Sequence, residues 1–75
     1  MILESRTEFT RQVTRNLLEL MCQDERSNAE ICRLAGLNPL TSYSWSREAR
    51  VASAYTIYRI CHVLNRDVRE VFPNG

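Results

Sequence analysis

The sequence predicts an all-α protein, a compact bundle of about five short helices, and three observations support that prediction. Helix-capping residues recur at short intervals along the 75-residue chain. Apolar residues repeat with the spacing of one helix face and do not alternate as in a strand. A glycine separates two short helical segments near the middle. A chain of this length forms one domain, residues 1–75, whose core is expected from about residue 7 to residue 72.

Helix starts are predicted from local capping signals. Residues 5–8 and 27–30 both have the S-x-x-E form of a capping box, in which the serine oxygen accepts a backbone N–H of the first turn. Asn38 precedes Pro39, and asparagine is a good N-cap while proline suits the first helical position. The predicted capping residues are Ser5, Ser27, Asn38, Ser53 and Asp67.

The apolar spacing agrees with these starts and gives the helix ranges. Helices are expected over roughly residues 7–23, 28–35, 39–46 and 54–64, with a short fifth helix after Asp67. The first helix has one apolar stripe, and the fourth has apolar residues at i, i+3, i+4 and i+7. The stripe residues are Phe9, Val13, Leu17, Leu20 and Met21 in the first helix and Ile57, Ile60, Cys61 and Leu64 in the fourth.

The cysteines and the histidine do not suggest a catalytic or metal site. Cys22, Cys32 and Cys61 form no C-x-x-C pair, and the lone His62 completes no zinc set. Adjacent helical residues such as Cys61 and His62 point about 100° apart, so they form no dyad. No Gly-rich phosphate loop is present. We therefore expect no enzyme, no cofactor, no metal and no small-molecule substrate.

The chain has no apolar run of bilayer length, so no membrane partner is expected. The apolar residues 1–3 are followed at once by Glu4, which leaves no hydrophobic core of a signal peptide. A cytoplasmic location is the expectation.

Charge is distributed unevenly although the net charge is only +1. The first thirty residues are acidic, whereas residues 31–66 carry a net charge of +4. Every basic residue is an arginine, whose planar fork suits phosphates and base edges. Charge alone leaves two alternatives open, a nucleic-acid contact and a solvated face. The basic residues of this stretch are Arg33, Arg47, Arg50, Arg59 and Arg66, against Glu48.

Gly36 lies between the second and third predicted helices. Glycine adopts the left-handed conformation without steric cost, so one helix can stop there and another can start at a steep angle. A short helix, a glycine turn and a second short helix are typical of the helix-turn-helix motif.

The segment 27–72 resembles the lambda-repressor-like helix-turn-helix family, also called Cro/C1 or XRE. The resemblance begins with S-N-A-E-I-C at 27–32 and continues through Gly36 and Leu37 to Trp45, where the family keeps an apolar residue. No insertion is needed up to Phe72. The fourth helix then supplies matches at the family's core positions. These are Thr56, Ile57, Ile60, Cys61 and Leu64.

The resemblance implies a sequence-specific, DNA-binding transcription regulator, such as a Cro/C1-like repressor or a controller protein. Its third helix would enter the major groove of double-stranded DNA, and a homodimer would bind two half-sites roughly 34 Å apart. Tyr55 and Tyr58 share one face of the fourth helix and suit either a dimer surface or partial burial in the monomer. The residues implied to face bases are Pro39, Leu40, Tyr43 and Ser44, and those implied to lie at the DNA backbone are Asn28, Arg47 and Arg50.

Two departures from the family leave alternatives open. Ser42 occupies a position that is usually aliphatic and buried, so either Tyr43 packs inward instead or Ser42 sits in a tight contact. Leu40 cannot make the bidentate base contacts that discriminate best. Trp45 is expected to fill the core, with a stacking role as its alternative. The alternative function is a protein-interaction module or antitoxin-type partner that keeps the fold without strong DNA binding.

Overall fold

The computed structural model describes residues 5–73, which form four α-helices and one 3-10 turn and contain no strand. The predicted all-α class is confirmed over these residues. Residues 1–4, on which the expected lack of a signal peptide depends, and residues 74–75 lie outside the described part of the predicted domain. The helices are α1 (Arg6–Cys22), α2 (Asn28–Leu34), α3 (Thr41–Ser46), α4 (Ala54–Leu64) and the 3-10 turn η1 (Val68–Glu70).

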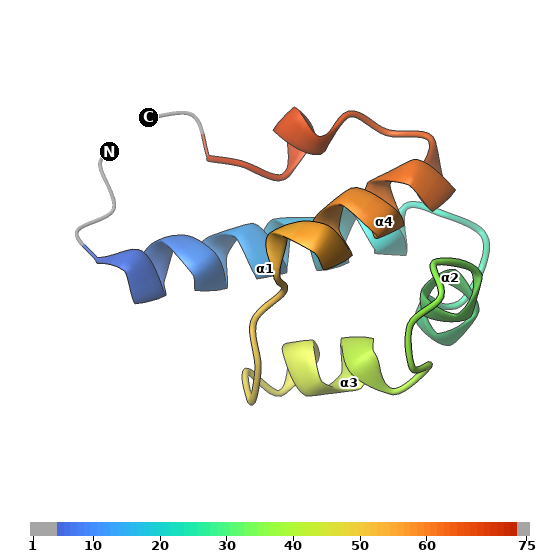
Figure 1. Cartoon of the computed structure of the whole chain (residues 1–75), viewed down its shortest axis with the longest axis horizontal. Helices are drawn as coiled ribbons and strands as arrows, with labels where there is room; N and C mark the ends of the chain where they lie inside the picture. Colours follow the sequence, from blue (N-terminus) through green and yellow to red (C-terminus); the bar gives the residue numbers. More distant parts are fainter. Residues whose placement is uncertain (1–4, 74–75) are drawn as a thin grey trace.

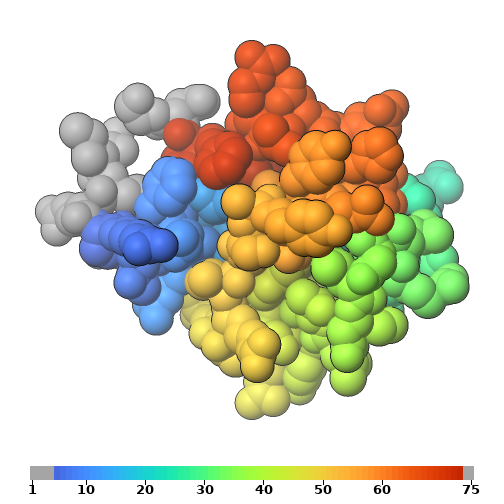
Figure 2. Space-filling view, viewed as in Figure 1, coloured from blue at the N-terminus to red at the C-terminus, as the bar shows by residue number. Residues whose placement is uncertain are grey.

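The helices are arranged so that α3 lies at one edge of the molecule and η1 at the opposite edge (Figure 1). In that view α1 and α4 run lengthwise across the centre, while α2 is seen nearly end-on. The short helix α3 packs against both α1 and α2, and α2 also packs against α4. The space-filling view shows α3 and the loop after it, in green to yellow, as the lower margin of the molecule (Figure 2).

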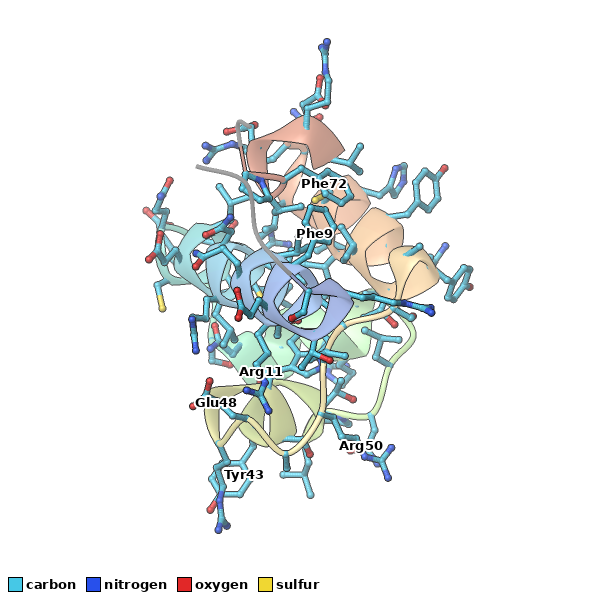
Figure 3. The ribbon with its side chains drawn as sticks, turned by 90° about the vertical axis from the view of Figure 1, so that its left-hand side faces the viewer. Phe9, Arg11, Tyr43, Glu48, Arg50 and Phe72 are labelled. Atoms are coloured by element: carbon cyan, nitrogen blue, oxygen red, sulfur yellow. The ribbon has the colours of Figure 1, made fainter. Side chains whose placement is uncertain are left out.

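The core is built from apolar side chains of all four helices. Leu17, Met21, Ile31 and Ile60 are completely buried, and Trp45 is buried among them, which confirms its predicted core role. Phe9 departs from the prediction, because it lies at the edge of the core instead of inside it. Its ring stacks on Phe72 with the centroids 6.1 Å apart (Figure 3). The remaining buried apolar residues are Val13, Leu20, Cys32, Ala35, Ala52, Ile57, Cys61, Leu64 and Val71.

Serine side chains cap three of the helices as predicted. Ser5, Ser27 and Ser53 each accept the backbone N–H of the residue three positions on, at 3.0, 3.1 and 3.2 Å. Asp67 caps η1 and forms a full capping box with Glu70. The predicted fifth helix is therefore present, but only as a single 3-10 turn.

The start of α3 differs from the prediction by two residues. Asn38 accepts the N–H of Leu40 on its side-chain oxygen at 2.8 Å, and its carbonyl accepts the N–H of Thr41 at 3.0 Å. These bonds close a turn through Pro39 before the helix begins at Thr41. Asparagine followed by proline fits a turn as well as a helix start, and here the turn forms.

Three helices end at a residue in the left-handed conformation. Gly36 has φ 80°, Glu48 has φ 58° and Asn65 has φ 57°. At Gly36 the backbone N–H groups close the helix end in the Schellman pattern, with Leu37 donating to the Cys32 carbonyl at 2.9 Å. The predicted role of Gly36 as the turn between α2 and α3 is confirmed. A left-handed residue at the end of α3 was not predicted, because no glycine marks it.

Candidate nucleic-acid interface

The orientation of α3 decides between the two alternatives that the sequence left open. Ser42 is buried, with 6 % of its surface exposed, whereas Tyr43 is 57 % exposed. Ser42 therefore faces the core and Tyr43 faces outward. Leu40, at the start of the helix, is 69 % exposed, Pro39 is exposed and Ser44 is half-buried. The four residues implied to face bases thus lie on the accessible side of the α3 region.

Tyr43 and Arg47 form one exposed unit at the end of α3. The guanidinium of Arg47 lies over the Tyr43 ring, 5.4 Å from its centroid, and also donates to the phenolic oxygen at 3.1 Å. Figure 3 shows Tyr43 and Arg50 pointing away from the body of the molecule on the same side. An aromatic ring held under an arginine offers both an apolar face and hydrogen-bond donors to one ligand.

Arg50, in the loop after α3, lies near the beginning of that helix. With Asn38, Leu40, Thr41 and Ser44 it lines a shallow hollow of about 180 Å³. The fold therefore brings a predicted backbone-binding residue next to two predicted base-facing residues. Asn38, in the turn before α3, and Thr41, the first residue of α3, were not predicted for this site.

The loop that carries both arginines is held by backbone bonds. Glu48 adopts the left-handed conformation, which costs a non-glycine residue roughly 1–2 kcal/mol. The N–H of Glu48 donates to the Trp45 carbonyl and the N–H of Ala49 to the Ser44 carbonyl, both at 3.0 Å, which makes a Schellman motif without glycine. Further on, the N–H of Ala52 donates to the buried Thr14 hydroxyl of α1 at 2.9 Å. The loop is thus fixed at both ends.

Several arginines of the basic stretch bond to other groups of the protein itself. Arg33 pairs with Glu30, and Arg66 pairs with Glu70. Arg59 donates from Nε to the Ala35 carbonyl at 3.0 Å, beside the end of α2. The charge of +4 counted along the sequence therefore overstates the charge available to a ligand. Within residues 5–73, Arg47 and Arg50 are the arginines of this stretch that neither form an ion pair nor bond to a backbone carbonyl.

Two arginines of α1 that were not predicted from the sequence lie beside Arg50. Arg11 and Arg15 lie one helical turn apart, and together with Arg50 and Glu48 they line a second hollow beside Trp45. Arg15 pairs with Glu48 at 2.7 Å, and both side chains are 55 % exposed. The hydrogen bond from Arg15 lowers the pKa of Glu48, and the nearby charges of Arg15 and Arg11 lower it further.

We call the set Arg11, Arg15, Arg47, Glu48 and Arg50 the basic corner. Four arginines and one glutamate give it a formal charge of +3, far above the +1 of the whole chain. Figure 3 shows Arg11 and Glu48 beside each other between α1 and α3. The i, i+4 spacing of Arg11 and Arg15 is the sequence signal that could have placed them on one face. This signal was not visible in the charge count, because the first thirty residues also carry acidic side chains.

The other predicted site residues lie outside this corner. Asn28 is the first residue of α2, is half-buried, and is not among the residues that line either hollow. Tyr55 and Tyr58 lie on α4 and are 67 % and 60 % exposed, so the larger part of each residue is accessible in the monomer. The ring of Tyr58 stacks over His62 with the centroids 6.4 Å apart.

Residues 5–73 show no group of three or more side chains that could hold a metal ion. None of the helices described has the length and apolar character needed to cross a membrane. Comparisons with protein-family models, with curated proteins and with solved structures found no match for this chain.

Proposed function

We propose that this chain is a DNA-binding transcription regulator of the helix-turn-helix kind that places α3 in the major groove of double-stranded DNA. The observation that carries the proposal is the exposed outer side of α3, where Tyr43 projects with Arg47 over its ring and Arg50 lies beside Leu40 and Ser44. The major groove is about 12 Å wide, and a helix with its side chains is about 10–12 Å across. An exposed short helix flanked by cationic forks matches that groove in size and in charge.

The residues have different roles in this arrangement. Arg47 and Arg50 neutralise phosphates on the strands that border the groove and so fix the position of the protein. Tyr43 and Ser44 reach base edges, where their hydroxyl groups donate or accept hydrogen bonds. Leu40 contacts a thymine methyl group but makes no hydrogen bond. This set discriminates among sequences less sharply than bidentate side chains would, so DNA shape contributes to specificity.

A homodimer is the proposed binding form. Tyr55 and Tyr58 are exposed on one face of α4, and tyrosine is enriched at protein interfaces. Two copies joined there would bind two half-sites, and the second contact would raise the overall affinity through its high local concentration. Sedimentation equilibrium on the wild type and on the Tyr55→Ala/Tyr58→Ala double variant tests this. We expect a dimer for the wild type and a shift toward monomer for the variant, and a monomeric wild type would exclude this interface.

A fluorescence-anisotropy titration of labelled mixed-sequence duplex DNA tests the proposed function. Phosphate contacts release counterions, so the logarithm of the affinity should fall linearly with the logarithm of the salt concentration. Arg47 and Arg50 together contribute about −1.8 to that slope per protomer. No binding at about 100 µM protein in low salt, or binding that does not respond to salt, would contradict the proposal, since even non-specific DNA binding is usually tighter than that.

The second candidate is a protein-interaction module without strong DNA binding. Leu40 favours it, because this leucine at the leading edge of α3 is 69 % exposed. Such a side chain suits an apolar partner surface. The same titration separates the two functions. An interaction module would leave the anisotropy of the duplex unchanged at every salt concentration.

A further inference from the structure

The basic corner contains a hollow in which an acidic side chain already lies against the arginines. Arg11, Arg15 and Arg50 line it, and the carboxylate of Glu48 accepts a hydrogen bond from Arg15 at 2.7 Å. Guanidinium groups bind carboxylate and phosphate oxygens through the same planar fork. Arginines from two elements, α1 and the loop after α3, thus converge on a place that suits an anion.

The Glu48 side chain lines the hollow and leaves little free space in it. The free space in the hollow is about 10 Å³. That is close to the room that a single water molecule needs. A phosphate group enters only if the Glu48 side chain moves aside. The Arg15–Glu48 pair is more than half exposed, and water screens such a pair strongly, so a polyanion can replace it.

The position of Glu48 is itself unusual. It is the left-handed residue that ends α3, where glycine would be free of strain. Strained backbone positions often mark functional sites, and here the strained residue is the acid of the hollow. The backbone of this segment is fixed by the Schellman bonds, so the side chain alone has to move when an anion arrives.

We propose that the hollow lined by Arg11, Arg15 and Arg50 is a phosphate-binding site, which Glu48 occupies in the free protein and vacates when DNA binds. The inference rests on the proposed function, because the DNA backbone is taken as the source of the phosphate. It extends the contact with DNA from α3 to α1. Glu48 then competes with the phosphate for Arg15, which lowers the affinity for any polyanion. Tight binding is restricted to duplexes that present a phosphate at this hollow.

A double-mutant cycle on Arg15 and Glu48 tests the site with DNA. Arg15→Gln removes one phosphate contact, so it should reduce the magnitude of the salt slope by about 0.9. Glu48→Gln keeps that contact and removes the carboxylate that the phosphate has to displace, so it should leave the slope within about 0.3 of the wild type and raise the affinity about 1.5-fold to fivefold, as expected for an exposed ion pair that no longer has to be broken. In the Arg15→Gln background the same substitution should give a smaller gain. An equal gain in both backgrounds would overturn the proposal, since Glu48 would then act by long-range repulsion alone.

Matched controls separate the site from overall charge. Glu25→Gln removes an exposed acid of the loop between α1 and α2, and Arg69→Gln removes an exposed arginine on η1, at the opposite edge of the molecule from α3. Both change the net charge of the chain by one unit, as the test variants do. The salt slope of Arg69→Gln should stay within about 0.3 of the wild type, and Glu25→Gln should not raise the affinity as Glu48→Gln does, if phosphates are bound at the basic corner. A slope change as large as that of Arg15→Gln in the first control, or a gain as large as that of Glu48→Gln in the second, would overturn the site.

A second measurement tests the site without DNA. Thermal unfolding of Glu48→Gln in sodium phosphate and in sodium chloride of equal ionic strength should show a higher melting temperature in phosphate, because a ligand that binds only the folded state stabilises it. The Arg15→Gln/Glu48→Gln variant should show no difference between the salts. A phosphate effect without DNA binding would support the anion site and remove the proposed function. If the protein binds DNA, but phosphate has no effect on the melting temperature and the effects of Arg15→Gln and Glu48→Gln are additive, the proposed function stands and the anion site is overturned.

Discussion

The hydroxyl of Thr14 on α1 accepts the backbone N–H of Ala52 at 2.9 Å, across 38 residues of sequence. The same hydroxyl donates to the Thr10 carbonyl at 2.8 Å, so it is used both as donor and as acceptor. Both Thr14 and Ala52 are buried. The bond ties the loop that carries Arg47 and Arg50 to the longest helix, and the placement of the basic corner depends on it.

Replacing Thr14 with valine should destabilise the protein. Valine keeps the shape but removes the acceptor, and a buried N–H left without a partner costs about 1–3 kcal/mol. Thr10→Val is the matched control, because the Thr10 hydroxyl bonds only to carbonyls of its own helix. Urea unfolding followed by circular dichroism measures both variants. Equal stability of the two would mean that the Thr14–Ala52 bond contributes nothing.

Gly36→Ala should also lower stability, through the backbone alone. Gly36 has φ 80°. An alanine in that conformation is disfavoured by roughly 1–2 kcal/mol. A Cβ added there would meet nothing closer than an Arg59 nitrogen at 3.7 Å, so crowding adds no cost. Thermal unfolding of this variant beside Ser46→Ala, an exposed position on α3, gives the comparison. A melting temperature equal to that of the Ser46 variant would argue against the left-handed turn between α2 and α3.

Much of the fold could be predicted because its signals are local. The range of α4 matches its apolar spacing, and three serines cap the helices that they were predicted to cap. The predicted start of α3 was wrong because Asn38 and Pro39 favour a turn and a helix start equally. The rotation of α3 could not be predicted either. Ser42 and Tyr43 each tolerate both environments, and only packing against α1 and α2 decides between them.

The candidate site was less predictable, because tertiary contacts decide which charges are free. Arg59 belongs to the basic stretch of the sequence, yet it donates to the Ala35 carbonyl beside the end of α2. Arg11 and Arg15 belong to an acidic part of the sequence, yet the packing of α1 against α3 brings them beside Arg50. Counting charge along the chain cannot distinguish an arginine that closes a helix end from one that faces solvent.

Acid should weaken the fold over a defined range. The hydrogen bonds from Arg26 and Arg69 lower the pKa of Asp24 and Asp67 from 3.8 to about 2. A carboxyl whose pKa is lower in the folded state stabilises it fully above the unfolded pKa, and that contribution is lost as pH falls through the folded pKa. The urea concentration at the unfolding midpoint should therefore decrease as the pH is lowered from about 4 to about 2.

The Asp67→Asn variant is the control for that pH range. Asparagine also caps helices well, so the cap on η1 survives while the titrating group is removed. Urea midpoints of the variant should depend less on pH between about 4 and about 2 than those of the wild type. If the two dependences coincide, the Asp67–Arg69 pair does not persist in solution.

Arg50→Ala and Arg47→Ala should weaken binding to all duplex sequences alike. Each removes one cation, so each should reduce the magnitude of the salt slope by about 0.9 per protomer. Arg47→Ala should lower the affinity more than Arg50→Ala does, because the Arg47 guanidinium also holds the Tyr43 ring. Anisotropy titrations with two unrelated duplexes measure this. A loss confined to one sequence would assign Arg50 to base contacts instead of phosphate contacts.

Tyr43→Ala should change which sequences are preferred without unfolding the protein. Tyr43 is 57 % exposed, so its removal leaves no cavity in the core. Stability should therefore change by less than about 0.5 kcal/mol. Selection from a random duplex library gives the preferred sites of the wild type and the variant, and Tyr43→Phe separates the hydroxyl from the ring. Tyr43 also orients Arg47, so Tyr43→Ala disturbs both residues. If Tyr43 contacts bases directly, Arg47→Ala should leave the wild-type sequence preference unchanged. If Arg47→Ala changes that preference in the same way, Tyr43 serves to position the arginine and the bases are recognised by other residues.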